Sequence, residues 1–151
     1  MIQDNIYQNP MHPWPVLKPF GQRISLSSVD LELFYFEAGQ ENKQTIIMIH
    51  GLGDEADTWR NIFLPLSQNF HVIALDLPGF GRSQKQNLAF TPGILVESLL
   101  GLINELNVAR PILMGSSLGA MLAHHIALVN PRLLRALILV GGALNQNEMG
   151  S

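Results

Sequence analysis

Residues 111–128, PILMGSSLGAMLAHHIAL, decide the fold of this chain. A short apolar run from Pro111 to Met114 is followed at once by Gly115-Ser116-Ser117-Leu118-Gly119, and then by a helical stretch that continues to Leu128. The order strand, tight turn, helix is the setting that the pattern G-x-S-x-G requires. We therefore predict a sharp strand-to-helix turn with Ser117 at its tip.

A turn of this kind exposes the serine hydroxyl at the N-terminus of a helix. The helix dipole and free N–H groups contribute positive potential there. Gly115 and Gly119 leave room for the crowded backbone and for packing of the helix on the strand. Ser117 is therefore the candidate catalytic nucleophile. The alternative is that Ser116 or Ser117 only caps the helix, which is a common role of serine.

A second motif, His50-Gly51-Leu52-Gly53, directly follows an apolar run. Acyl transfer needs two backbone N–H groups that point at the developing oxyanion. One comes from the residue after the nucleophile, here Leu118, and the other from a loop after an early strand, where Leu52 lies. Gly51 and Gly53 let this loop approach the site closely. His50 could be a catalytic base, but we expect it to anchor the loop by hydrogen bonds.

The third motif is the segment 76–83, DLPGFGRS. Its proline and glycines predict a rigid turn. Asp76 could be a catalytic acid, but we expect it to hold this turn, with Arg82 in local contact. No Gly-Lys-Ser/Thr follows, so the segment is not expected to bind a nucleotide phosphate.

Outward from these motifs, apolar runs alternate with helical stretches. Two alternating segments, 23–27 and 31–36, predict an antiparallel pair at a sheet edge. Unbroken aliphatic runs predict parallel strands that are buried on both faces. These runs are 45–49, 72–75, 112–114 and 136–140, and the expected helices are 58–68, 92–107 with Thr91 as N-cap, and 117–128. The fold class is therefore α/β: a mostly parallel sheet with helices on both faces.

Composition narrows the class of protein further. Only 14% of the 151 residues are charged and 47% are hydrophobic, which excludes intrinsic disorder. A net charge of −3 gives no basic footprint, so no nucleic-acid partner is expected. The chain has no cysteine, and its five histidines lack metal-ligand spacing. We therefore expect no disulfide, no metal and no cofactor.

The N-terminal residues 1–21 differ from the rest. They contain four prolines, which favour extended backbone, and we expect an extended arm on the surface that Trp14 anchors. The start of the chain does not have the pattern of a signal peptide, and no apolar run is long enough to span a bilayer. A cytoplasmic location without a membrane span is the expectation.

Together the motifs HGLGDEADTW, DLPGFGRS and GSSLGA, in this order and spacing, resemble the α/β-hydrolase superfamily over about residues 22–143. The resemblance implies the α/β-hydrolase fold and a nucleophile at Ser117. A serine there is unlike the haloalkane dehalogenase and epoxide hydrolase branches, which carry an aspartate. The chain looks more like the esterases, carbon–carbon hydrolases, peptidases and cofactor-free haloperoxidases of the superfamily.

The catalytic triad of the superfamily runs Ser, then Asp or Glu, then His, and this chain departs from that order. After Ser117 the only acid is Glu148, and the only histidines are His124 and His125 on the helix of the nucleophile. His124 lies about 10 Å along the helix axis from Ser117, out of reach of its hydroxyl. We therefore expect the acid and the histidine beyond residue 151. Residues 22–151 are interpreted as a partial α/β-hydrolase domain, truncated after about the sixth strand, without the lid and the C-terminal strands.

Truncation would leave the last expected strand, Ala136 to Val140, with a neighbour on one side only. A flat apolar strand edge templates pairing with other chains. We therefore predict self-association, or docking of a complementing C-terminal half, through this edge.

The favoured function is a serine hydrolase that acts on an ester, amide or related carbonyl of a small-molecule substrate through a covalent acyl-serine. The isolated 151 residues are expected to be incomplete and inactive. Two alternatives stay open. One is a non-catalytic binding or scaffold protein on the same fold. The other is an acyltransferase or cofactor-free haloperoxidase that uses the same residues.

Overall fold

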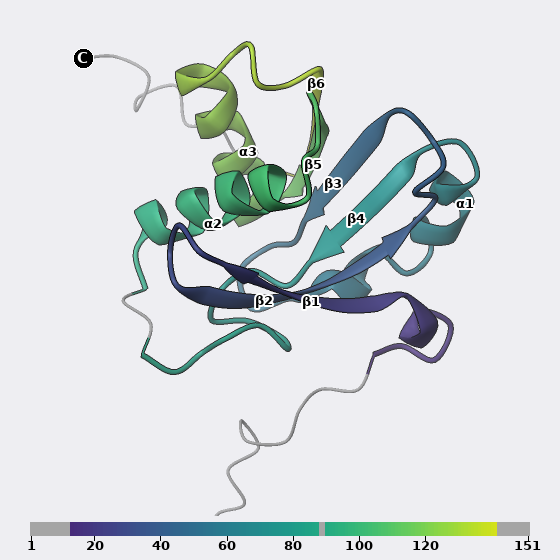
Figure 1. The fold of residues 1–151 in the computed structure, drawn as a ribbon, viewed down its shortest axis with the longest axis horizontal. Helices are drawn as coiled ribbons and strands as arrows, with labels where there is room; N and C mark the ends of the chain where they lie inside the picture. The colour runs from purple at the N-terminus through teal and green to yellow at the C-terminus, as the bar shows by residue number, and fades with distance from the viewer. Residues whose placement is uncertain (1–12, 88–89, 142–151) are drawn as a thin grey trace, which may run out of the picture.

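A computed structural model describes residues 13–87 and 90–141 and shows one six-stranded sheet (Figure 1). The strands are β1 (Gly21–Leu26), β2 (Leu31–Ala38), β3 (Thr45–Ile49), β4 (His71–Leu75), β5 (Ile112–Ser116) and β6 (Ala136–Val140). Their order across the sheet is β1-β2-β4-β3-β5-β6. β1 and β2 run antiparallel at one edge, and β4, β3, β5 and β6 are mutually parallel. The predicted α/β class is confirmed.

Helices cover both faces of the sheet. α2 (Pro92–Glu105) and α3 (Leu118–Val129) pack on one face, and α1 (Phe63–Ser67) packs on the other (Figure 1). The strand side chains alternate between the two layers: Ile47 and Ile49 join the core under α2 and α3, whereas Met48 joins the core with Phe63 of α1. Because successive side chains of a strand point to opposite faces, an unbroken aliphatic run is needed to fill both layers.

The start of α2 is set by its sequence. The side chain of Thr91 accepts a hydrogen bond from the N–H of Ile94 at 3.3 Å, and Pro92 occupies the first turn, where its missing N–H is not needed. The helix then buries an apolar stripe that includes Leu95, Leu99 and Leu102. The predicted capping residue is confirmed.

The predicted continuous helix over 58–68 is wrong. The chain forms a short 3-10 helix, Ala56–Trp59, then a turn, and then the short α1. Pro65 explains the break, because a proline inside a longer helix would remove a hydrogen bond and clash with the preceding turn. With the helix starting at Phe63, the proline falls in the first turn, where it is tolerated.

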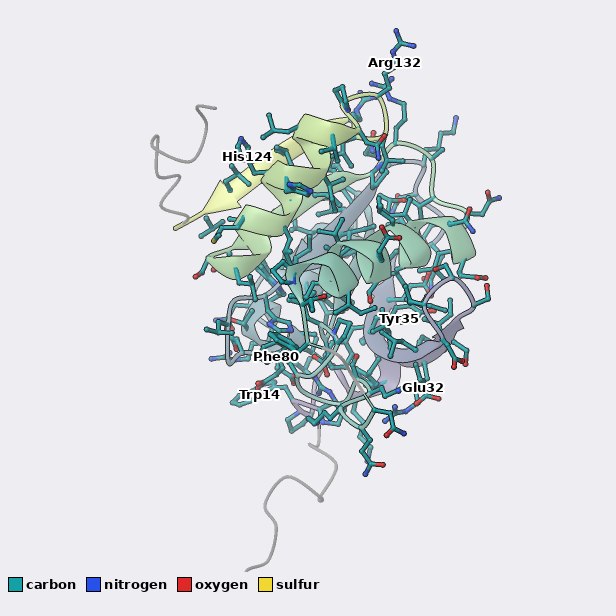
Figure 2. All side chains as sticks on the ribbon, turned by 90° about the vertical axis from the view of Figure 1, so that its left-hand side faces the viewer. Trp14, Glu32, Tyr35, Phe80, His124 and Arg132 are labelled. Atoms are coloured by element: carbon teal, nitrogen blue, oxygen red, sulfur yellow. The ribbon has the colours of Figure 1, made fainter. Side chains whose placement is uncertain are left out.

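The described part of the N-terminal arm is anchored by Leu17. Its side chain is fully buried, whereas the predicted anchor, Trp14, is 52% exposed. Trp14 is labelled in Figure 2; its ring lies against the guanidinium of Arg60, 4.9 Å from the ring centroid. The backbone N–H of Trp14 donates to the carboxylate of Asp57. The arm is not extended throughout, since Lys18–Phe20 form a 3-10 helix. Residues 1–12 of the arm lie outside the described residues.

β6 is the edge strand of the sheet among the residues that the structure describes. It pairs with β5 on one side. Its side chains are largely exposed, including Ile138 at 40% and Val140 at 45%, and Leu128 and Val129 at the end of α3 are also exposed. An apolar surface therefore continues from α3 onto the sheet edge. Across the described ranges, no helix is long and apolar enough to cross a membrane.

Candidate active site

Ser117 forms the turn between β5 and α3. Its backbone has φ 50° and ψ −113°, in a region that non-glycine residues rarely adopt. Strain of this kind costs about 1–3 kcal/mol and clusters at functional sites. The turn is held by hydrogen bonds: the N–H of Ser117 donates to the carbonyl of Val140 at 3.2 Å, and its own carbonyl accepts from Met121 at 3.1 Å.

The side chain of Ser117 is exposed and makes no capping hydrogen bond to α3. The residue occupies the N-cap position by chain order, but its hydroxyl does not serve the helix. The simple capping interpretation therefore does not explain why a serine stands here. The strained backbone instead presents the hydroxyl to the outside of the turn.

Two glycines make this turn sterically possible. A Cβ added to Gly119 would lie 2.7 Å from the carbonyl oxygen of His50 and still closer to that of Ile49. A Cβ on Gly115 would meet the backbone N of Ala120 at 2.5 Å. The start of α3 is thus packed directly against the backbone at the end of β3. The spacing of the predicted turn, with glycine two residues before and after Ser117, has a steric cause.

The loop after β3 lies against this turn. A Cβ on Gly51 would be 3.3 Å from the Cβ of Ser117 and 3.9 Å from its hydroxyl oxygen. Leu52 follows with its side chain 71% exposed, and Gly53 has a positive φ of 75°. Within the described residues, the N–H groups of Leu52 and Leu118 donate to no protein acceptor. Both predicted oxyanion donors are therefore available to a ligand.

His50 holds this loop in place with both ring nitrogens. Its side chain is fully buried; Nδ1 donates to the carbonyl of Gly51 at 2.7 Å, and Nε2 accepts from the N–H of Leu77 at 2.9 Å. These partners require the neutral ring, and burial lowers its pKa below the ordinary value. A ring engaged in this way has no free nitrogen for a substrate proton. The geometry agrees with an anchoring role and not with a base.

The third motif is also structural. The carboxylate of Asp76 is fully buried and accepts from the backbone N–H of Ala56 and Arg82, both at 2.7 Å. The guanidinium of Arg82 binds it in a bidentate manner, at 2.7 and 3.0 Å. Asp57 forms a second ion pair with Arg82. These charges fasten the loops after β3 and β4 to each other, so Asp76 and Arg82 hold the turn as expected.

Sequence reasoning missed Asp57. The segment DEADTW contains three acids and no motif that distinguishes one from the next. The only signal was indirect: a buried arginine needs more hydrogen-bond acceptors than one carboxylate supplies. Asp57 also accepts from the backbone N–H of Trp14, so it ties the N-terminal segment to the loops after β3 and β4.

An aromatic row lies beside the anchored loop. The ring of Phe80 is 5.5 Å from that of His50 and 5.6 Å from that of Phe90, both in edge-to-face contact. Figure 2 shows Phe80 below α3, on the side of the molecule away from Arg132. Phe90 is 52% exposed. The row leads from the buried histidine to the surface.

No side chain in the described ranges is hydrogen-bonded to the hydroxyl of Ser117. His124 is partly buried and His125 exposed along α3, and His124 is labelled on that helix in Figure 2. His71 is engaged with Glu37 at 2.7 Å. The described part of the chain also holds no cluster of three or more potential metal ligands. A general base and its acid are thus not found among these residues.

The strained serine turn, the adjoining glycine loop and the sheet order together indicate a family. A family model described as "alpha/beta hydrolase fold" matches residues 44–150. The chain belongs to the alpha/beta hydrolase fold family. Hydrolase relatives and solved neighbours with this fold agree with the assignment.

Two curated relatives and one solved structure illustrate the range of proteins to which this chain is similar. It is 34% identical over 131 residues to 2-hydroxy-6-oxononadienedioate/2-hydroxy-6-oxononatrienedioate hydrolase 2 of Pseudomonas putida, covering 80% of this chain and 43% of the relative. It is 36% identical over 109 residues to the pimeloyl-[acyl-carrier protein] methyl ester esterase of Proteus mirabilis, covering 72% and 40%. It matches the crystal structure of a serine hydrolase involved in carbazole degradation with a TM-score of 0.73 and 29% identity, covering 85% and 50%. The chain thus spans about 40% of the length of these two curated relatives.

Proposed function

We propose that this chain carries the nucleophile and oxyanion site of a serine hydrolase that acts on an ester, amide or related carbonyl substrate. Its relatives are named hydrolases and esterases, and a hydrolytic function fits the family. The observation that carries the proposal is the geometry of Ser117. A strained, exposed serine that does not cap its helix stands against Gly51, in a loop where the N–H of Leu52 donates to no acceptor among the described residues.

The proposed chemistry proceeds in two halves. The hydroxyl oxygen of Ser117 attacks the carbonyl carbon, its proton passes to a histidine base, and the N–H groups of Leu52 and Leu118 stabilise the oxyanion. The bond to the leaving group then breaks, and the leaving group takes up the proton. Water attacks the acyl-serine with the same base, which releases the acid and restores the hydroxyl.

We infer that the base and its acid are supplied from outside the described residues. His50 has both nitrogens engaged, and His124 and His125 lie along α3, which leads away from Ser117. The relatives are more than twice as long as the matched region, so they offer chain in which such groups can lie. Residues 1–151 alone are accordingly proposed to lack hydrolytic activity.

We propose that the exposed edge of β6 is where a further strand joins the sheet and completes the domain. A further strand, from a complementing segment or from a second copy of this chain, would cover Ile138 and Val140 and pair with the open backbone of β6. We also propose a cytoplasmic location and a small-molecule substrate.

The test compares two neighbouring serines. Ser117→Ala and Ser116→Ala are introduced into the protein in its own host, and hydrolysis of p-nitrophenyl esters is measured on the purified products. Ser117→Ala is expected to abolish hydrolysis, as removal of a triad member does in serine hydrolases. Ser116→Ala is the matched control and is expected to retain it. Equal activity of the two variants would refute the nucleophile, and a folded protein without any esterase or acyltransferase activity would favour the binding-protein alternative.

A further inference from the structure

A groove between α2 and α3 begins beside the serine turn. Its volume is about 490 Å³, within the range of small-molecule sites. The lining comes from positions 92–97 of α2 and 118–125 of α3: Pro92, Gly93, Val96 and Glu97 on α2, and Leu118, Met121, Leu122 and His125 on α3. Leu118, the residue after Ser117, is shared by the groove and the proposed oxyanion site.

The groove has a direction. Positions 118, 121, 122 and 125 form one stripe along α3, since they are spaced by three, four and seven residues. At 1.5 Å per residue this stripe is about 10 Å long. Its near end at Leu118 and its middle at Met121 are apolar, and the polar side chains Glu97 and His125 stand farther along each helix.

The lining predicts the kind of group that it accepts. Met121 is 52% exposed although it is a flexible apolar side chain, and Val96 faces the same space from α2. Covering such surface stabilises a complex by about 25 cal/mol per Å² of apolar area. An apolar groove about 10 Å long, with its polar side chains at the far end, fits an unbranched hydrocarbon chain better than a compact polar group.

We propose that this groove binds the acyl chain of the substrate, and that the protein prefers carbonyl substrates with a medium-length, apolar acyl chain over acetyl substrates. This acyl-chain proposal rests on the proposed function, because it assumes that the substrate carbonyl lies at Ser117. The acyl group stays bonded to Ser117 through the second half of the reaction, while the leaving group departs. Leu118 follows Ser117 and lines the groove, so an acyl chain that leads from Ser117 past Leu118 would lie in it.

Octanoate, the product form of such a substrate, tests the site without catalysis. Methionines are labelled at the methyl group, and octanoate or acetate is titrated while the methyl resonances are recorded. A saturable shift of the Met121 resonance with octanoate and none with acetate is expected. Met48, which is fully buried in the opposite core, serves as the internal control. No shift of Met121, or equal shifts at both methionines, would overturn the proposal.

Variants separate the groove from the rest of the surface. Val96→Trp fills the groove and is expected to weaken octanoate binding at least tenfold by calorimetry. Val129→Trp places the same side chain outside it, at an exposed position at the end of α3, and is expected to leave binding unchanged. Met121→Glu is the second test variant, because Met121 is at an exposed site that tolerates a polar side chain. It is also expected to weaken octanoate binding, and it replaces Val96→Trp if that variant does not fold. Octanoate binding that survives both groove variants would overturn the proposal.

The failure of this proposal is distinguishable from failure of the proposed function. Ser117→Ala is expected to retain a saturable octanoate shift of Met121, because the lining that receives the hydrocarbon chain does not include Ser117. If Ser117 proves inactive but octanoate still shifts Met121, the groove stands as a binding site and the hydrolase proposal falls. If Ser117 is active but octanoate leaves Met121 unchanged, the acyl-chain site is refuted.

Discussion

Replacing Gly119 by alanine tests how closely the serine turn is packed. The new Cβ would lie 2.7 Å from the carbonyl oxygen of His50 and nearer still to that of Ile49, whereas ordinary contact begins at 3.4 Å. These are backbone atoms, which cannot rotate away, so α3 and the end of β3 would have to separate by more than an ångström to restore ordinary contact. Overpacking costs about 1–3 kcal/mol and occasionally more. With two carbonyls obstructed, we expect a loss of at least about 3 kcal/mol in the free energy of unfolding.

The matched control is Gly93→Ala, the same chemical change in α2. There the nearest atom to the new Cβ is the hydroxyl of Thr91 at 3.7 Å, so no neighbour must move. Alanine is favoured over glycine in a helix by about 0.5–1 kcal/mol, so stability should be unchanged or slightly raised. Urea unfolding, followed by the fluorescence of the buried Trp59, measures both variants. Midpoints of the two variants that agree within error would refute the steric account of the turn.

Three further predictions concern charge and the sheet edge. Burial lowers the pKa of His50, so below about pH 6.5 the unfolded chain binds more protons than the folded protein. The free energy of unfolding should therefore fall with decreasing pH, by up to about 1.4 kcal/mol per pH unit. Urea unfolding at several pH values should show a weaker pH dependence in His50→Gln, and an equal pH dependence would contradict the buried neutral ring. Asp76→Asn leaves the guanidinium of Arg82 buried without its bidentate carboxylate partner, and should lower the free energy of unfolding by about 3–5 kcal/mol in the same assay. A negligible loss would contradict the buried ion pair. Because β6 exposes an unpaired apolar edge, residues 1–151 should sediment as oligomers, and Leu139→Lys on β6 should shift them toward monomer. A wild-type protein that sediments as a monomer would refute self-association through β6.

Much of the fold follows from short-range patterns. The unbroken run 45–49 had to be a strand covered on both faces, and the capped stripe that starts at Thr91 had to be an amphipathic helix. The same reasoning failed at 58–68, where Pro65 forces the helix to begin late. The order of strands was not accessible, because β4 lies between β2 and β3 through a crossover that no local pattern records.

In the candidate site, too, local features were predictable from the sequence and long-range contacts were not. The turn at Ser117 was predictable because its glycines have fixed spacing around a strand-to-helix junction. The anchor of the N-terminal segment was not, since Leu17 and Trp14 are both apolar and only the packed structure decides which one is buried. The contact of Asp57 with Arg82 spans 25 residues of sequence and depends on how two loops meet.

The nucleophile is tested most directly by a fluorophosphonate probe, which bonds to activated serines. The protein is isolated from its own source and treated with the probe. Its intact mass is measured by mass spectrometry, and it is then digested to locate the adduct. The account predicts one adduct, on the peptide that contains Ser117, and none in Ser117→Ala. A folded protein that stays unlabelled, or that carries the adduct on another residue, would contradict it.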